Sequence, residues 1–188
     1  MSGQRTLTID KILATSANVV DEQGYAKLNL NVIAAALGIK PPSLYNHVSG
    51  IEDVQRRLAE TVLARMENAV KTAAIGRSGD DALREIAKEY RSFSTEHPEL
   101  YRAFTNAPPL GGKLNGLAET LQQVMRPFAL NETDEINFIR SFHSALHGFV
   151  ALERTGFFKS SDIDIDVSFG ALIENQIIIL HSIRGKLL

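Results

Sequence analysis

Apolar residues recur at helical spacing along most of the chain. In residues 8–23, Ile9, Ile12, Leu13 and Val20 stand on one side of a helix, because residues three or four apart share a helical face. The same spacing predicts further helices over 50–73, 82–96, 114–129, 133–155 and 165–185, with a short helix after His97-Pro98. With two short helices inside 29–47, the pattern predicts an all-α fold of about nine helices.

The segment from Leu28 to Val48 has the signals of two short helices joined by a tight turn. Asn29 suits an N-cap, and Gly38 suits the left-handed residue that ends a helix. Pro41 and Pro42 can only begin a helix, because proline lacks the N–H that a helix interior needs. Two helices joined in this way form a helix-turn-helix, whose second helix can enter the major groove of DNA.

The order of residues in this segment is more specific than a helical corner. Ala34-Ala35 precedes Leu37-Gly38-Ile39 at the turn, and Ser43-Leu44-Tyr45-Asn46-His47 follows. This run resembles the DNA-binding domain of the TetR family of bacterial transcriptional regulators. The resemblance implies a DNA-binding domain in residues 1–50. It also implies a ligand-binding and dimerisation domain in 51–188, in which the helix 51–73 is the linker.

The resemblance assigns roles by position around the second short helix. Asn29, Tyr45 and His47 are expected to contact phosphates, which position a protein without reading sequence. Lys40 is expected to reach a phosphate or a guanine edge, and the start of the helix is expected to approach base edges. For Asn46, base contact and simple solvation are even alternatives. The expected DNA-contacting set is Asn29, Lys40, Pro41, Pro42, Ser43, Tyr45, Asn46 and His47.

The second half of the chain resembles one TetR subgroup, which is named for a Trp-His-Gly signature. His147-Gly148-Phe149 matches part of that signature. In the family, the last two helices pair with those of a second subunit, so we expect a homodimer through these helices. The resemblance further implies that ligand entry tilts the linker helix and releases a repressor from its operator.

Aromatic and polar side chains on several predicted helices are candidates for an apolar effector pocket. Each of them equally suits an ordinary core. The expected pocket set is Tyr90, Phe93, His97, Tyr101, Phe104, Leu121, Met125, Phe128, Phe142 and His143. The effector itself stays unidentified.

Charge gives the DNA-binding interpretation little support. The chain carries a net charge of −2, with +1 in residues 1–57 and −3 in the remainder. Many relatives have a phosphate-contacting lysine near the start of the linker helix, where this chain has Ile51. The alternatives are therefore a small-molecule-binding helical dimer with weakened or lost DNA binding, or a helical protein-interaction adaptor.

Other classes of function find no support. The chain has no cysteine, no apolar run long enough to span a membrane and no secretory signal, so we expect a cytoplasmic protein without a membrane partner. His143 and His147 are four residues apart, which suits a metal site or a pair of core histidines. No third ligand is evident, so we expect no metal and no cofactor. No catalytic motif occurs, so we expect no enzyme.

Overall fold

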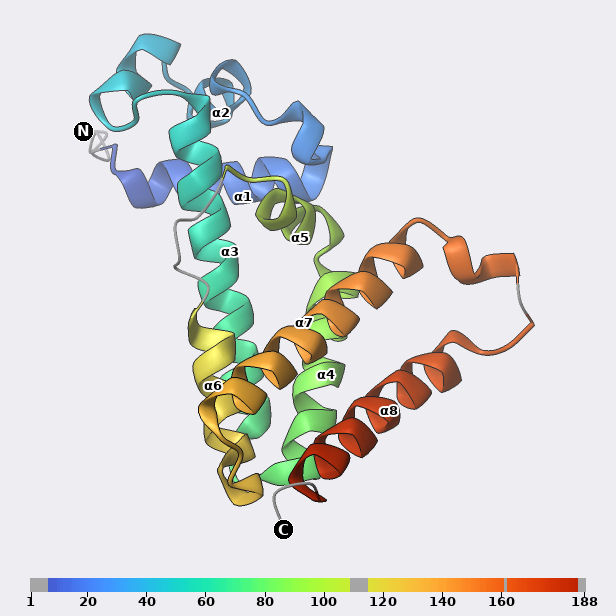
Figure 1. Ribbon diagram of the computed structural model, residues 1–188. Helices are drawn as coiled ribbons and strands as arrows, with labels where there is room; N and C mark the ends of the chain where they lie inside the picture. The colour runs from blue at the N-terminus through green and yellow to red at the C-terminus, as the bar shows by residue number, and fades with distance from the viewer. Residues whose placement is uncertain (1–6, 109–114, 161, 186–188) are drawn as a thin grey trace. The chain divides into compact units, whose positions relative to one another are not determined.

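The computed structural model describes residues 7–108, 115–160 and 162–185, which are almost entirely helical (Figure 1). No strand occurs within these ranges, so the all-α prediction is confirmed. The α-helices are α1 (Ile9–Gln23), α2 (Leu30–Leu37), α3 (Ile51–Ala74), α4 (Gly79–Glu96), α5 (Pro98–Thr105), α6 (Asn115–Met125), α7 (Glu132–Arg154) and α8 (Ile165–Gly185). The 3-10 helices are η1 (Tyr25–Lys27), η2 (Pro41–Asn46), η3 (Arg126–Phe128) and η4 (Phe157–Ser160).

The chain divides into two compact units. Within the described ranges, the first unit covers 7–65 and 97–108, and the second covers 66–96, 115–160 and 162–185. α3 contributes residues to both units. These units are defined by packing. The functional boundary that the sequence analysis places near residue 50 stays a prediction.

The first unit packs α1 against α2 and α5. Its core consists of apolar side chains that are almost fully buried: Ile12, Val20, Ile33, Leu44, Val54, Leu58, Leu100 and Tyr101. Thr8 begins α1 as its N-cap, and its hydroxyl oxygen accepts a hydrogen bond from the Lys11 amide at 3.3 Å. The sequence also suggests a flexible arm over residues 1–7 with Arg5, and residues 1–6 of it lie outside the described residues.

The membership of α5 in the first unit was not predicted from the sequence. A carboxylate oxygen of Glu99 accepts a hydrogen bond from the backbone N–H of Tyr25 at 2.8 Å. Gly24 lies beside it with φ +86°, and a Cβ at that position would stand 3.4 Å from Glu99 Oε2. Glycine therefore provides both the turn after α1 and the room for this contact.

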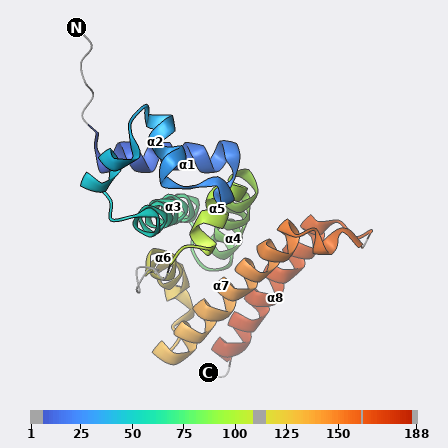
Figure 2. The ribbon, with the colours of Figure 1, turned by 90° about the horizontal axis from the view of Figure 1, so that it is seen from above.

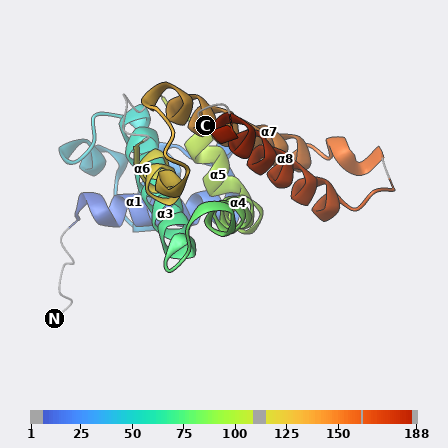
Figure 3. The ribbon, with the colours of Figure 1, turned by 60° about the horizontal axis from the view of Figure 1, so that its bottom comes forward.

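The second unit is organised around α4, which packs against α6, α7 and α8. α7 and α8 run side by side in opposite directions (Figures 2 and 3). The amide of Gly116 donates to Glu67 Oε1 at 2.9 Å, which joins the N-terminal turn of α6 to α3. Phe138, Phe142, Leu146 and Val150 of α7 are buried, as the apolar pattern predicts.

Two helix ends differ from the sequence prediction. α4 begins at Gly79, so Asp80 and Asp81 lie in its first turn, where carboxylates favour the positive end of the helix dipole, and do not cap it. α6 ends at Met125 and continues as η3. Pro127 in η3 explains this change, because its ring removes a donor and disfavours a continued α-helix.

Arg91 of α4 ties together the three long helices of the second unit. Its guanidinium bonds both carboxylate oxygens of Glu153 on α7, at 2.7–3.2 Å, and Asp166 on α8 at 2.8 Å. The guanidinium also lies over the ring of Phe169, 4.8 Å from its centroid. The hydrogen bonds to Glu153 raise the pKa of Arg91 above its ordinary value. The side chains of Arg91 and Glu153 are only 17% and 15% exposed, so this pair is largely desolvated.

Among the described residues, no helix is long and apolar enough to cross a membrane.

Arg91→Leu is expected to lower the free energy of unfolding by about 2–4 kcal/mol, because it leaves the largely buried Glu153 carboxylate without its partner. Urea unfolding at fixed protein concentration measures the change. Arg84→Leu is the matched control, since Arg84 pairs with the exposed Glu174 and an exposed pair contributes about 0–1 kcal/mol. Equal losses in the two variants would contradict this interpretation.

Candidate nucleic-acid interface

The turn between α2 and η2 has the geometry that the sequence predicts. Asn29 Oδ1 accepts a hydrogen bond from the Val32 amide at 3.0 Å, so Asn29 is the N-cap of α2. Gly38 ends the helix in the left-handed conformation, with φ +67°. The amides of Gly38 and Ile39 donate to Ala35 and Ala34, both at 3.0 Å, which satisfies the last carbonyls of the helix.

The second helix of the motif is a 3-10 helix, where the sequence analysis expects an ordinary short helix. It runs from Pro41 to Asn46, and the amides of Ser43 and His47 donate to Lys40 and Leu44, three residues earlier. Two successive prolines leave few N–H groups to begin an α-helical pattern, and 3-10 geometry is common in such short pieces.

A 3-10 helix has three residues per turn, and the burial of η2 follows that period. Leu44 is 0% exposed, and Pro41 and His47 on the same side are half-buried. Pro42 and Tyr45 are exposed on the second side, Tyr45 at 60%. Buried Leu44 thus holds the helix against the core of the first unit, while the neighbouring side faces outward.

The predicted DNA-contacting residues divide by exposure. Five are exposed on the surface, and these are Asn29, Lys40, Pro42, Tyr45 and Asn46. Three are half-buried, and these are Pro41, Ser43 and His47. Among the described residues, Lys40 has no ion-pair partner and the Tyr45 hydroxyl has no hydrogen-bond partner. Both groups are therefore available to a phosphate.

The side chain of Asn29 already uses both its oxygen and its nitrogen in hydrogen bonds within the chain. Its side-chain oxygen caps α2, and its Nδ2 donates to the carbonyl of Lys27 at 3.0 Å. Phosphate contact by this residue stays a prediction. Asn31, which the sequence analysis did not select, is exposed in the first turn of α2 and has a free amide within the described chain.

Asp53 makes several polar contacts at the start of α3. Its carboxylate accepts from the Ser49 amide at 3.2 Å and binds both Arg56 and Arg57. Burial acts to raise the pKa of Asp53, but the hydrogen bonds from Arg57 and Ser49 and the two positive charges outweigh burial and hold it below the ordinary value. The two arginines are therefore held by a carboxylate, and Ile51 supplies no charge.

The predicted effector-pocket residues are distributed over both units. His97, Tyr101 and Phe104 belong to the first unit, where the rings of Tyr101 and Phe104 meet edge to face at 6.2 Å. The others belong to the second unit, and they are Tyr90, Phe93, Leu121, Met125, Phe128, Phe142 and His143. All but His143 of this second group are buried. The pocket as a whole stays a prediction.

A small polar cluster lies beside the buried Tyr90 in the second unit. The Tyr90 hydroxyl is 3.5 Å from His147 Nδ1, and the ring of His143 meets that of Tyr90 edge on at 5.8 Å. Burial lowers the pKa of His143, with a smaller contribution from the charge of His147, and burial also lowers the pKa of His147. Both rings therefore favour the neutral form. Within the described ranges, no three His, Asp or Glu side chains stand together as a metal site.

Comparison with known sequences finds relatives that match most of this chain. The chain is 35% identical over 174 residues to the HTH-type transcriptional regulator Rv0681 of Mycobacterium tuberculosis, covering 89% of this chain and 78% of the relative. It is 27% identical over 190 residues to the HTH-type transcriptional regulator YobS of Bacillus subtilis, covering 94% and 98%.

Solved structures share the fold at low sequence identity. TetR from Acinetobacter baumannii AYE has a TM-score of 0.76 at 16% identity, over 95% of this chain and 99% of that one. ActR from Streptomyces coelicolor, in complex with (S)-DNPA, has a TM-score of 0.70 at 18% identity, over 93% and 97%.

A family model described as the C-terminal domain of tetracyclin repressor-like proteins matches residues 83–175. This match lies in the second unit and in α5, whereas the relative from Mycobacterium tuberculosis covers most of the chain. Together with the helix-turn-helix of the first unit, these similarities show that the chain belongs to the TetR family of transcriptional regulators.

Proposed function

We propose that this regulator is a repressor, which binds its operator as a homodimer and leaves it when a small molecule binds the second unit. The observation that carries the proposal is the exposed side of η2, where Pro42 and Tyr45 project from a helix fixed by buried Leu44. Two such helices in a symmetric dimer can enter successive major grooves about 34–36 Å apart.

The roles of single residues in DNA binding follow from exposure and chemistry. Lys40 and Tyr45 contact phosphates, because both are exposed and their polar groups are available. Pro42 and Ser43 approach base edges at the start of η2, where proline offers an apolar contact to a thymine methyl group. Asn46 is exposed and takes part in base contact or remains solvated. The functional domains 1–50 and 51–188 are part of this proposal.

Release by a small molecule is supported by two similarities. The family model that matches residues 83–175 describes repressor-like proteins. ActR, which has the same fold, is known in complex with (S)-DNPA. The effector of this chain enters the apolar interior of the second unit near Tyr90, where His143 is the half-exposed polar group. The partial match of His147-Gly148-Phe149 to the Trp-His-Gly signature supports that subgroup.

A dimer through α7 and α8 is supported by their exposed sides. On α8, Val167 and Ile178 are 64% and 61% exposed, an unusual exposure for large apolar side chains. On α7, Ser144, Gly148 and Ala151 form a line of small residues, and the exposed side of this helix also carries Leu152, which is 41% exposed. Large apolar groups on one helix and small ones on the next are complementary to a second copy of the same pair.

The alternative is a ligand-binding dimer in which DNA binding is weak or lost. Asp53 favours it, because this carboxylate holds Arg56 and Arg57 and leaves no free cation at the start of α3 in the described structure. A gel shift with the DNA that flanks the gene decides between the two functions.

Lys40→Ala and Tyr45→Phe are each expected to weaken operator binding. Tyr45→Phe removes a hydrogen bond to a charged group, which contributes about 1.5–3 kcal/mol. Lys40→Ala is expected to reduce the salt slope of binding by about one per contact, or about two per dimer. Gel shifts at several salt concentrations measure both effects, with Lys159→Ala, an exposed lysine of η4, as the control. Unchanged binding in both variants would count against docking on DNA through this side of η2.

Gly148→Arg and Ile178→Asp are each expected to convert the dimer to single subunits. A Cβ at Gly148 meets nothing within 4 Å in one subunit, so the larger side chain leaves the subunit's fold intact. Sedimentation or light scattering gives the mass. Ile75→Asp is the matched control, because Ile75 is an exposed isoleucine, 72% exposed, away from α7 and α8. Dimers in both test variants would rule out this interface.

A small molecule that stabilises the protein in a thermal-shift screen is expected to release it from operator DNA. Selective binding to the folded protein raises the melting temperature, and release requires that the ligand favour the DNA-free state. The gel shift is repeated with increasing compound. A compound that binds the second unit, as shown by loss of the thermal shift in His143→Phe, and yet leaves DNA binding unchanged would contradict ligand-controlled repression.

A further inference from the structure

A groove of about 540 Å³ lies between the C-terminal part of α3 and α6, within the second unit. The residues that line it come from α3, from the turn after α3 and from α6, and they are Asn68, Lys71, Thr72, Ala74, Ile75, Arg77, Thr120, Gln123 and Val124. None of these nine residues belongs to α7 or α8, and none is in the expected effector pocket. The groove is therefore separate from both, and its volume falls within the range of about 300–1,000 Å³ in which small-molecule sites occur.

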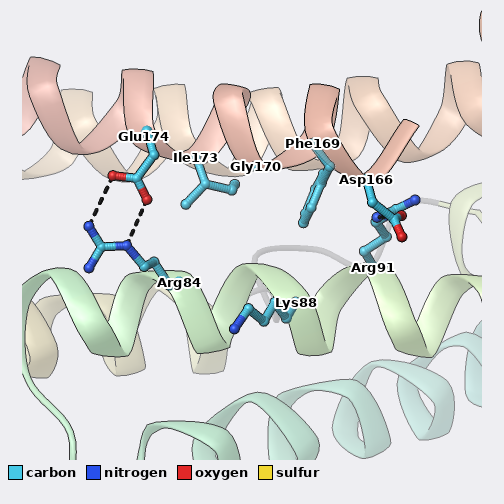
Figure 4. Close-up of a pocket in the computed structure, with 8 residues that line it drawn as sticks. All are labelled: Arg84, Lys88, Arg91, Asp166, Phe169, Gly170, Ile173 and Glu174. Carbon is cyan, nitrogen blue, oxygen red and sulfur yellow. Dashed lines mark hydrogen bonds and ion pairs between the residues drawn. The ribbon is translucent and has the colours of Figure 1, made fainter. Parts of the chain in front are cut away.

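The charges of this groove differ from those of the groove between α4 and α8, which Figure 4 shows. In the α4–α8 groove each cation has a carboxylate within ion-pair distance, and these pairs include Arg84 with Glu174, Lys88 with Glu85, and Arg91 with Asp166. The lining of the α3–α6 groove contains two cations, Lys71 and Arg77, and no carboxylate. The described ranges of the second unit hold fifteen acidic residues against ten basic ones. A positively charged groove thus stands in an acidic unit.

Lys71 carries a positive charge that no carboxylate of the described structure neutralises. Its side chain is exposed in the last turn of α3 and has no ion-pair partner there. Glu67 lies four residues earlier on the same helix, a spacing that allows an ion pair. The Glu67 carboxylate instead accepts a hydrogen bond from the Gly116 amide of α6 at 2.9 Å. The ammonium of Lys71 is therefore available to an anion from solution.

Arg77 is held beside the end of α3 by backbone carbonyls. Its Nη1 donates to Ala73 at 2.9 Å and to Ile75 at 3.5 Å, whereas its Nε and Nη2 donate to no acceptor within the described ranges. The hydrogen bond from Lys88 lowers the pKa of Glu85, with a smaller contribution from the charge of Arg77, so Arg77 acts on that carboxylate only from a distance. A guanidinium that is fixed in place and keeps free N–H groups suits the oxygens of a phosphoryl group.

Neutral donors and apolar surface complete the lining. The amides of Asn68 on α3 and Gln123 on α6 are exposed, and neither has a hydrogen-bond partner in the part of the chain that the structure describes. Val124 is 6% exposed and Ile75 is 72% exposed. The two walls therefore offer hydrogen-bond donors to an anion and apolar contact to a group attached to it.

We propose that this groove binds a small phosphate monoester with an apolar organic group. A phosphate monoester carries a charge of about −1.5 to −2 at neutral pH, which the charges of Lys71 and Arg77 match. Its three terminal oxygens accept from these two cations and from the amides of Asn68 and Gln123. A carboxylate has one charge and two oxygens, and it leaves part of this donor set unused.

Phenyl phosphate is the probe for this site, and benzoate and inorganic phosphate are the matched ligands. Titration calorimetry of the full chain in a phosphate-free buffer measures the three affinities. We expect phenyl phosphate to bind at least about tenfold more tightly than either matched ligand, because benzoate lacks the second charge and inorganic phosphate lacks the apolar group.

Lys71→Gln and Arg77→Gln are each expected to weaken phenyl phosphate binding by about tenfold or more, because each removes a charge-assisted hydrogen bond. Lys88→Gln is the matched control, since Lys88 is an exposed lysine of the same unit that pairs with Glu85 and lies outside this groove. The control is expected to bind phenyl phosphate as the wild-type chain does.

Thr72→Glu tests the sign of the charge in a second way. Thr72 is exposed on α3 and lines the groove, so a glutamate at this position places a carboxylate beside the bound anion. We expect Thr72→Glu to abolish phenyl phosphate binding and Thr72→Gln, which has the same size and no charge, to preserve it. Glutamate and glutamine both favour an exposed helical position, and circular dichroism checks that each variant folds.

Absence of phenyl phosphate binding to the wild-type chain would overturn the proposal. Equally tight binding of benzoate would overturn the choice of a phosphoryl group, and equally tight binding of inorganic phosphate would overturn the choice of a monoester. Wild-type affinity in both Lys71→Gln and Arg77→Gln would place the ligand elsewhere. All these titrations are made without DNA, so their outcome is independent of operator binding, which is measured separately by gel shift.

Discussion

The burial of Leu44 is the constraint on which the exposed side of η2 depends. Full burial of a leucine side chain contributes about 1.5–3 kcal/mol, and this leucine is 0% exposed. In a helix with three residues per turn, fixing Leu44 inward also fixes the directions of Pro42, Ser43 and Tyr45. A six-residue helix with two prolines has little stability of its own, so the packing of one side chain sets the orientation of all its exposed ones.

The sequence predicts features that depend on near neighbours. The N-cap at Asn29 and the left-handed turn at Gly38 follow from residue type and position, and both are found. The long helices follow from apolar spacing, with ends that differ by a few residues at Gly79 and Met125. Periodicity over only six residues does not distinguish a 3-10 helix from an α-helix, so the true period of η2 needed the structure.

The sequence does not predict which distant parts of the chain come into contact. The pairing of Glu99 with the Tyr25 amide joins residues 74 positions apart, and it places α5 in the first unit. Arg91 and Glu153 are 62 positions apart, and the sequence shows each only as one more charged residue on a helix. The candidate DNA surface was accessible from sequence because it is one local motif.

The net charge of this chain does not predict DNA binding, which depends instead on where single side chains lie. A chain of net charge −2 gives no general attraction to DNA, and in the first unit Asp53 holds two of the available arginines. In the proposed function, affinity for an operator rests on a few directed contacts from η2 and on the presence of two DNA-binding units in one dimer. Such an arrangement makes binding sensitive to the distance and orientation between the two DNA-binding units of the dimer. A ligand that binds the second unit can therefore weaken DNA binding without touching η2, provided that it favours one state of the residues joining the units. Those joining residues are α3, which has residues in both units, and the His97-Pro98 step between α4 and α5.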